Sequence, residues 1–141
     1  MALHFTNSIE IAHSAERVFA LLADVARTPE WLSRCTAAEI EGPIAAGAKL
    51  RLSVLQGKKT GTLVGSITAF EPATRIAFHY GDALFAAMLE FGLSPTTTGT
   101  RLVETLDITT HTFAGKLAQP LIRGVLAKVL VTDLEKLRNL V

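Results

Sequence analysis

A single carboxylate stands among apolar residues in one predicted hairpin. Two strands are expected at 83–93 and 100–110, joined by a turn rich in Ser, Pro, Thr and Gly. If Leu93 pairs with Thr100, one face of this hairpin carries Phe85, Leu89, Phe91, Leu102, Leu106, Ile108 and Glu104. Apolar surroundings raise the pKa of a carboxyl group, which suits Glu104 to proton transfer or to a hydrogen bond with a ligand hydroxyl or carbonyl. A register slipped by one residue would instead turn Glu104 to solvent.

Two other polar residues interrupt rows of apolar side chains that are expected to face inward. Asn7 lies between Phe5 and Ile9 on an alternating strand, so its amide could orient a ligand or bond a neighbouring backbone group. Tyr80 shares a face with Phe78, and its phenol could bind a ligand carbonyl or simply pack with a hydrated hydroxyl. Both residues are therefore candidate ligand contacts, and either could be the hydrogen-bond donor that works with Glu104.

The remaining reactive residue types give no recognisable catalytic or metal-binding pattern. No histidine has a partner at metal-ligand spacing, and Cys35 is favoured as a small core residue over a nucleophile. Glycine-rich phosphate loops and the Gly-x-Ser-x-Gly elbow are absent. We therefore expect no metal and no cofactor. Trp31 could cover the mouth of a ligand cavity, although packing between a short helix and the sheet is favoured.

The pattern of the chain predicts one α+β domain over residues 1–141. Ser14 is the expected N-cap of a helix that ends near Asp24, and Thr28 with Pro29 is the expected start of a second short helix. Strands are expected at 3–11, 36–41, 60–70, 75–80, 83–93 and 100–110, with another through Leu50, Leu52 and Val54. A bulge is expected at Gly65. Sequential short strands with tight turns favour an antiparallel meander.

The last thirty or so residues change to a helical period. One apolar face is expected to consist of Phe113, Leu117, Leu121, Val125, Val129, Leu130, Leu134 and Leu137. Pro120 is expected to kink this helix or to start a second segment. A single amphipathic helix must pack on the concave face of a curved sheet. Residues Phe113, Leu117 and Leu121 are therefore expected to line a cavity opposite Leu52 and the hairpin.

Composition and charge exclude some functions. Hydrophobic residues make up 49% of the chain and charged residues 19%, which fits either a large core or interface, or an internal apolar cavity. A net charge of +1 without a basic cluster predicts no nucleic-acid partner. One cysteine suits a reducing compartment, and neither a signal peptide nor a membrane-spanning segment is expected, so a cytoplasmic location is favoured.

Several phrases of the sequence resemble a known family. They are Ser8-Ile9-Glu10-Ile11, Ser14–Asp24, Pro29-Glu30-Trp31, Ile67–Pro72 and Gly99-Thr100-Arg101-Leu102. Together they are similar to the polyketide cyclase/dehydrase-like branch of the START-like (SRPBCC) superfamily. This resemblance implies a helix-grip fold, START-like and Bet v 1-like, in which a curved antiparallel sheet surrounds a long C-terminal helix. It also implies a deep apolar cavity, in members that include both simple binders and enzymes.

Three functions remain open on the sequence. The first is binding or transport of a hydrophobic small molecule, such as a lipid or a polyketide, which needs only a shaped cavity and a few hydrogen bonds. The second is a cyclase or dehydratase that uses Glu104 as general base. The third is a non-catalytic interaction or stress-response module, in which the surplus of apolar residues forms a homodimer interface.

Overall fold

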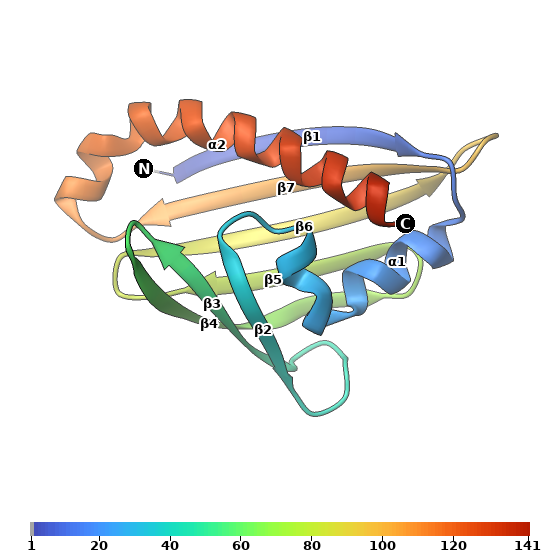
Figure 1. The fold of residues 1–141 in the computed structure, drawn as a ribbon, viewed down its shortest axis with the longest axis horizontal. Coiled ribbons are helices and arrows are strands. Elements are labelled where there is room, and N and C mark those ends of the chain that lie inside the picture. The colour runs from blue at the N-terminus through green and yellow to red at the C-terminus, as the bar shows by residue number, and fades with distance from the viewer. Residues whose placement is uncertain (1) are drawn as a thin grey trace.

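The structure is a computed structural model that describes residues 2–141, with Ala2 and residues 113–119 described by their backbone only. Its elements, in chain order, are β1 (Ala2–Ile11), α1 (Ala15–Ala23), the short 3-10 helix η1 (Val25–Glu30), β2 (Cys35–Glu41), β3 (Lys49–Gln56), β4 (Lys59–Glu71), β5 (Arg75–Gly81), β6 (Phe85–Pro95), β7 (Thr100–Thr110) and α2 (Phe113–Leu140). All strands belong to one antiparallel sheet in the order β1-β7-β6-β5-β4-β3-β2 (Figure 1).

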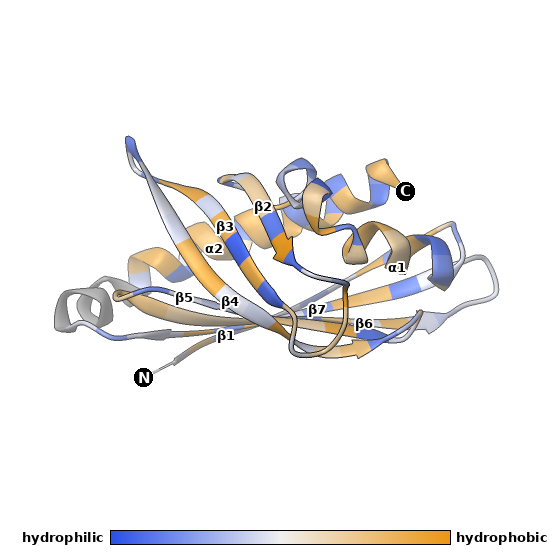
Figure 2. Ribbon diagram, turned by 90° about the horizontal axis from the view of Figure 1, so that it is seen from below, coloured by the Kyte–Doolittle hydropathy of each residue, from blue (hydrophilic) through white to orange (hydrophobic). Residues whose placement is uncertain are grey.

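The sheet is curved, and its helices lie on one side of it. Figure 2 shows α1 and α2 above the strands, while β2 and β3 rise on that same side. The inner face carries most of the core, because alternate strand residues such as Ile76, Phe78, Leu89 and Leu102 are buried. The expected curved sheet with a long C-terminal helix is therefore confirmed.

The first helix begins as its sequence predicts, whereas the second begins earlier. Ser14 caps α1 by accepting a hydrogen bond from the backbone N–H of Arg17 at 3.3 Å. The expectation that Thr28 caps the next helix is wrong. Helix η1 already begins at Val25, and the Thr28 hydroxyl, inside that helix, donates to the Val25 carbonyl at 2.7 Å. Trp31 consequently follows η1 instead of lying on it.

The hairpin of β6 and β7 pairs two residues away from the expected register. Pro95, not Leu93, lies opposite Thr100, so that Phe91 faces Glu104 and Leu89 faces Leu106. The cause is a shorter turn, closed by a hydrogen bond from the Thr96 N–H to the Gly99 carbonyl at 2.9 Å. A shift of two residues leaves every side chain on its predicted face, since side chains alternate with a period of two.

Strand β4 approaches β5 unusually closely at Gly65. The expected bulge is not there, because the register shift lies between Ile67 and Ala69. A Cβ atom built on Gly65 would lie 1.6 Å from the His79 carbonyl oxygen, so no other residue fits without moving the backbone.

Gly65→Ala is expected to destabilise the protein by about 1–3 kcal/mol, because the two backbones must separate to admit the methyl group. Gly92→Ala is the matched control in β6, where a Cβ would meet nothing within 4 Å. We expect that control to change the stability by no more than about 0.5 kcal/mol. Urea unfolding of both variants measures the difference. Equal losses would contradict the close approach of β4 and β5.

The predicted apolar face of α2 is buried only in the second half of the helix. Leu130, Asp133, Leu134 and Leu137 are buried, while Leu121 is 80% exposed and Val125 60%. Residues four apart advance by roughly 40° around a helix, so the series from Leu121 to Val129 drifts away from the later leucines. Leu121 and Val125 consequently lie on the solvent side of α2, whereas Leu130, Leu134 and Leu137 lie on the side that faces the sheet. The helix continues through Pro120, which neither ends it nor starts a second one.

Candidate functional site

Glu104 lies on the inner face of the sheet, near the middle of β7. Its neighbours across the strands are Asn7 on β1 and Phe91 on β6. Glu104 is only 1% exposed, which confirms that it faces inward. Neither of its carboxylate oxygens has a hydrogen-bond partner among the described residues. Because buried polar groups in proteins nearly always have partners, this pair of free oxygens marks a place where a further polar group belongs.

A second unpartnered polar group belongs to Trp31. Its side chain is 1% exposed, and its ring meets Phe91 edge to face, with centroids 5.5 Å apart and planes at 86°. Its indole Nε1 has no hydrogen-bond partner in the described part of the chain. Phe91 is thus flanked by Glu104 along the sheet and by Trp31 above it. Packing, the favoured role of Trp31, is observed, and its free N–H adds a donor.

Helix α2 brings a second carboxylate, Asp133, against the same interior. Its oxygens accept hydrogen bonds from the Ser33 N–H at 3.2 and 3.3 Å and from the Ser33 hydroxyl. The Lys136 ammonium in turn donates to the Ser33 hydroxyl oxygen at 3.2 Å. Sequence reasoning missed Asp133. The sequence does contain a signal for it, because Asp133 is an acidic residue at helical spacing from the apolar Leu130, Leu134 and Leu137.

Burial changes the protonation of both carboxyl groups. It raises the pKa of Glu104 from 4.5 to about 8, and the nearby charge of Asp133 adds to this effect. Burial also raises the pKa of Asp133, although the Ser33 hydrogen bonds and the Lys136 charge oppose it. Glu104 is therefore mostly protonated at neutral pH. In this form it can donate one hydrogen bond and accept others.

The other predicted site residues differ in how far they are buried. Leu52, Tyr80, Leu89 and Phe91 are buried and Asn7 and Phe85 half-buried, whereas Leu121 is exposed; the side chains of Phe113 and Leu117 lie outside the described residues. Leu121 thus cannot line an enclosed interior, because it lies opposite the buried face of α2.

Asn7 and Tyr80 differ in their relation to Glu104. Asn7 is directly opposite it, whereas Tyr80 is in register with Ala87, and Ala87 with Ile108, four residues further along β7. Four residues span roughly 13 Å, and two strand spacings add roughly 10 Å sideways. Asn7 therefore qualifies as a partner for Glu104 and Tyr80 does not. Burial also raises the pKa of the Tyr80 hydroxyl, which keeps it protonated.

Cys35 behaves as the small core residue that was expected. It is buried, its thiol contacts the Ala37 carbonyl at 3.4 Å, and burial raises its pKa. A raised pKa disfavours the thiolate that nucleophilic chemistry requires.

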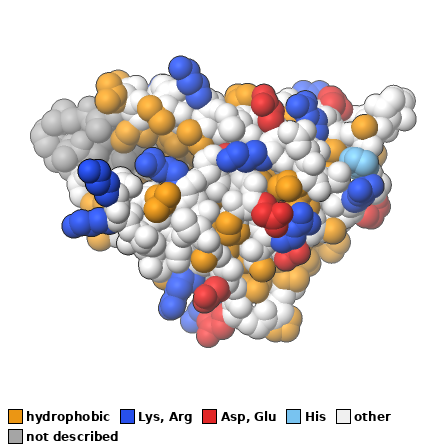
Figure 3. All heavy atoms as spheres, viewed as in Figure 1, with side chains coloured by type: hydrophobic (Ala, Val, Ile, Leu, Met, Phe, Trp, Pro, Cys, Tyr) orange, Lys and Arg blue, Asp and Glu red, His pale blue; other side chains and the backbone are white. Residues whose placement is uncertain are grey.

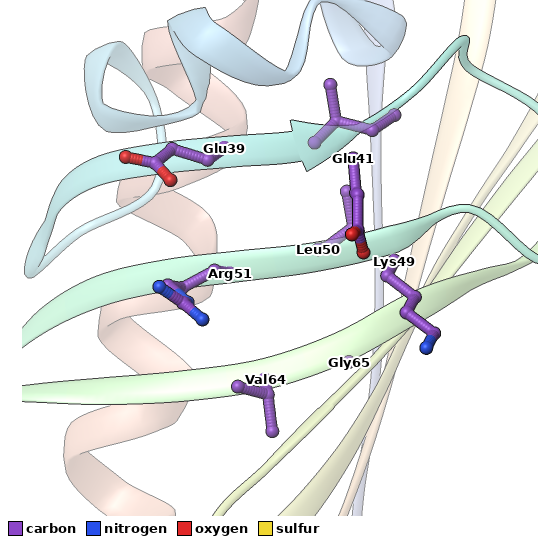
Figure 4. Close-up of a pocket in the computed structure, with 8 residues that line it drawn as sticks. Glu39, Glu41, Lys49, Leu50, Arg51, Val64 and Gly65 are labelled. Atoms are coloured by element: carbon purple, nitrogen blue, oxygen red, sulfur yellow. The ribbon is translucent and has the colours of Figure 1, made fainter.

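Two surface depressions lie away from Glu104. One of about 380 Å³ lies on β2, β3 and β4, where the outward side chains of Glu39, Glu41, Lys49, Arg51 and Val64 surround it (Figure 4). The other, of about 330 Å³, lies between α1 and the end of α2. The first has charged side chains of both signs in register, Glu39 with Arg51 and Glu41 with Lys49. Such pairs are ordinary for a solvated outer face.

Thr6, His4 and Asp107 are connected in the order of a catalytic triad, but they lie on an exposed surface and not in a pocket. His4 Nδ1 lies 2.5 Å from Asp107 Oδ1, and the Thr6 hydroxyl lies 3.2 Å from His4 Nε2. Both His4 and Asp107 are about half exposed on the outer face, and neither depression includes them. A cross-strand surface cluster accounts for these contacts.

Comparison with known protein families shows to which family this chain belongs. A family profile described as "Polyketide cyclase / dehydrase and lipid transport" matches residues 2–141. The chain belongs to this family. No curated protein matches it. Within the polyketide cyclase/dehydrase and lipid transport family, fold is shared across different activities, so the individual residues have to carry the functional argument.

Solved structures confirm the helix-grip fold of this family member. An aromatase/cyclase, ZhuI, from a Streptomyces species superposes with a TM-score of 0.82 at 19% identity, over 99% of this chain and 93% of that one. A START superfamily protein from Mycobacterium smegmatis gives 0.79 at 18%, over 96% and 94%. The di-domain aromatase/cyclase StfQ of the steffimycin pathway gives 0.79 at 14%; the match covers 98% of this chain and half of the di-domain chain.

Among the residues that the structure describes, no helix is both long and apolar enough to cross a membrane.

Proposed function

We propose that this protein binds a hydrophobic small molecule between the inner face of the sheet and α2, with Glu104 as its polar anchor. The observation that carries the proposal is that both buried Glu104 oxygens lack a hydrogen-bond partner among the described residues. A buried carboxyl group left unsatisfied costs stability, which a ligand hydroxyl or carbonyl would recover. The family, which includes lipid transport, supports the same class of ligand.

The neighbours of Glu104 suit an apolar ligand with one polar end. Phe91 and Leu106 are buried beside it, and Phe5 and Phe85 are half-buried further toward the start of α2. Asn7, across the strand from Glu104, adds an amide. A protonated Glu104 would donate to a ligand oxygen, and Asn7 or the free Trp31 N–H would donate to a second one. Few polar groups within an apolar lining are typical of small-molecule sites.

Ligand binding is expected to depend on the protonation of Glu104. The probe is Nile red, an uncharged apolar dye with a carbonyl group, measured by fluorescence titration below and above pH 8. Wild-type affinity is expected to fall above pH 8, where the carboxyl group ionises. Glu104→Gln, which keeps a neutral donor, is expected to bind equally well on both sides of that pH.

Glu104→Leu completes the comparison because it keeps the volume and removes the hydrogen bonds. We expect it to weaken dye binding by about 10-fold or more at neutral pH. Equal affinity of all three proteins at every pH would refute Glu104 as an anchor. Native mass spectrometry of freshly purified protein then identifies the class of any small molecule that co-purifies.

A second candidate function rests on the same carboxyl group. A pKa of about 8 is close to working pH, as suits a proton-transfer residue. Because Glu104 is mostly protonated at neutral pH, a dehydratase or cyclase would use it first as a general acid, instead of the general base that was expected. Activity would then be lost in Glu104→Gln, whereas simple binding would persist in that variant.

A further inference from the structure

One end of the molecule combines exposed apolar side chains with basic ones. The β3–β4 hairpin, the β5–β6 turn and the start of α2 all lie at this end (Figure 1). Two hydrogen bonds connect them: Gln56 Nε2 donates to Asp82 Oδ2 at 3.2 Å, and the His111 N–H donates to the Leu84 carbonyl at 2.8 Å. The exposed residues of this "basic end" are Leu55, Lys58, Lys59, Leu84, Leu121, Arg123, Val125 and Lys128.

The apolar members of the basic end are large and well exposed. Leu84 is 54% exposed, and on α2 Leu121 and Val125 are more exposed still. On the helix they lie opposite the buried leucines, so they play no part in holding α2 against the sheet. Such residues in a protein surface mark a contact with something outside the molecule when they occur together.

Most of the charges around these residues are positive. From 113 to 132 the sequence contains Lys116, Arg123 and Lys128 and no acidic residue. Asp82, the acid of the β5–β6 turn, is already engaged, since its oxygens accept hydrogen bonds from Leu84, Phe85 and Gln56. In the left part of Figure 3, the described side chains beside the grey atoms are mostly blue and orange.

We propose that the basic end docks on the surface of an anionic lipid bilayer. Leu121, Val125 and Leu84 enter the boundary between headgroups and acyl chains, while Lys128, on the same side of α2 as Leu121, contacts lipid phosphates. A helical segment with exposed apolar residues and basic charges binds such an interface, because apolar burial and attraction to anionic lipid act together. The attachment is peripheral. It uses only outward side chains, so it stands independently of ligand binding at Glu104.

Sedimentation with vesicles tests the proposal. The full chain is mixed with vesicles of phosphatidylcholine and phosphatidylglycerol in equal parts, and with vesicles of phosphatidylcholine alone. We expect binding to the first kind, weaker binding to the second, and a loss of binding as salt is added. Leu121→Ser combined with Val125→Ser is expected to lower binding by about 10-fold or more. Lys128→Gln is expected to lower it by about 5-fold.

Val64→Ser is the matched control. Val64 is 57% exposed, close to Val125 in type and exposure, but it projects from the outer face of β4 (Figure 4). We expect this variant to bind vesicles like the wild type. Absence of binding to either vesicle, or an equal loss in Val64→Ser, would overturn the proposal. A wild-type dimer that the Leu121 and Val125 substitutions dissociate would also overturn it, since these residues would then contact a second copy of the chain.

Discussion

Between pH 4.5 and about 8, the wild-type protein is expected to lose unfolding free energy as the pH rises, and the Glu104→Gln variant is expected to lose much less. In this range the folded protein keeps the Glu104 proton while the unfolded chain releases it. The unfolded state therefore binds fewer protons, and stability falls with rising pH. A carboxyl group whose pKa moves from 4.5 to about 8 on folding accounts for a loss of about 5 kcal/mol across the window.

Asp133 adds a smaller slope of the same sign, because burial raises its pKa as well. Glu104→Gln should thus flatten the curve without abolishing the slope. Urea unfolding followed by circular dichroism at several pH values gives the comparison. Glu10→Gln, an exposed substitution on the same sheet, serves as control and should parallel the wild type. A Glu104→Gln curve that also ran parallel would show that Glu104 is ionised in the folded protein, and the anchor proposed for it would fail.

Leu137→Ala is expected to destabilise the protein by about 2–5 kcal/mol, whereas Leu121→Ala is expected to change its stability by no more than about 0.5 kcal/mol. The two leucines belong to the same helix and undergo the same substitution. Leu137 is completely buried against the core, so its truncation leaves a cavity, while Leu121 has little contact to lose.

Chemical unfolding of the two variants measures the contrast directly. A large loss in Leu121→Ala would mean that the exposed part of α2 is in fact packed, and the docking surface assigned to it would be wrong. A small loss in Leu137→Ala would mean that the end of α2 is loosely held. The unfolding data for Leu121→Ala also show whether substitutions at this position of α2 leave the protein folded, as the vesicle measurements require.

Alternation of side chains made the inward position of Glu104 predictable. The pairing of β6 and β7 was wrong by two residues, yet Glu104 stayed on its face because an even shift preserves parity. The register itself depends on turn geometry, and the predicted turn was too long. The neighbours of Glu104 therefore changed: Phe91 replaced Leu89 as its cross-strand partner.

The orientation of α2 could not be predicted in the same way. In a helix, side chains do not alternate between two faces as they do in a strand. Residues four apart differ in direction by roughly 40°, so a long series at this spacing includes residues from opposite sides of the helix. The series through Leu121 and Val125 consequently mixed solvent-facing residues with the buried Leu130, Leu134 and Leu137. Asp133 was missed for a related reason, because only its contact with Ser33, 100 residues away in the chain, explains a buried acid there.

The pairing of β1 with β7 joins the first strand of the chain to the last, and it has a consequence for folding order. Asn7 meets Glu104 only when this pair forms, and Ser33 meets Asp133 only when α2 has docked. Contacts between residues so far apart in sequence carry a large loop-closure entropy and form late, and folds dominated by them reach the native state in milliseconds to seconds. The surroundings of Glu104 are thus among the last parts of the molecule to assemble, and partial unfolding from either terminus dismantles them first.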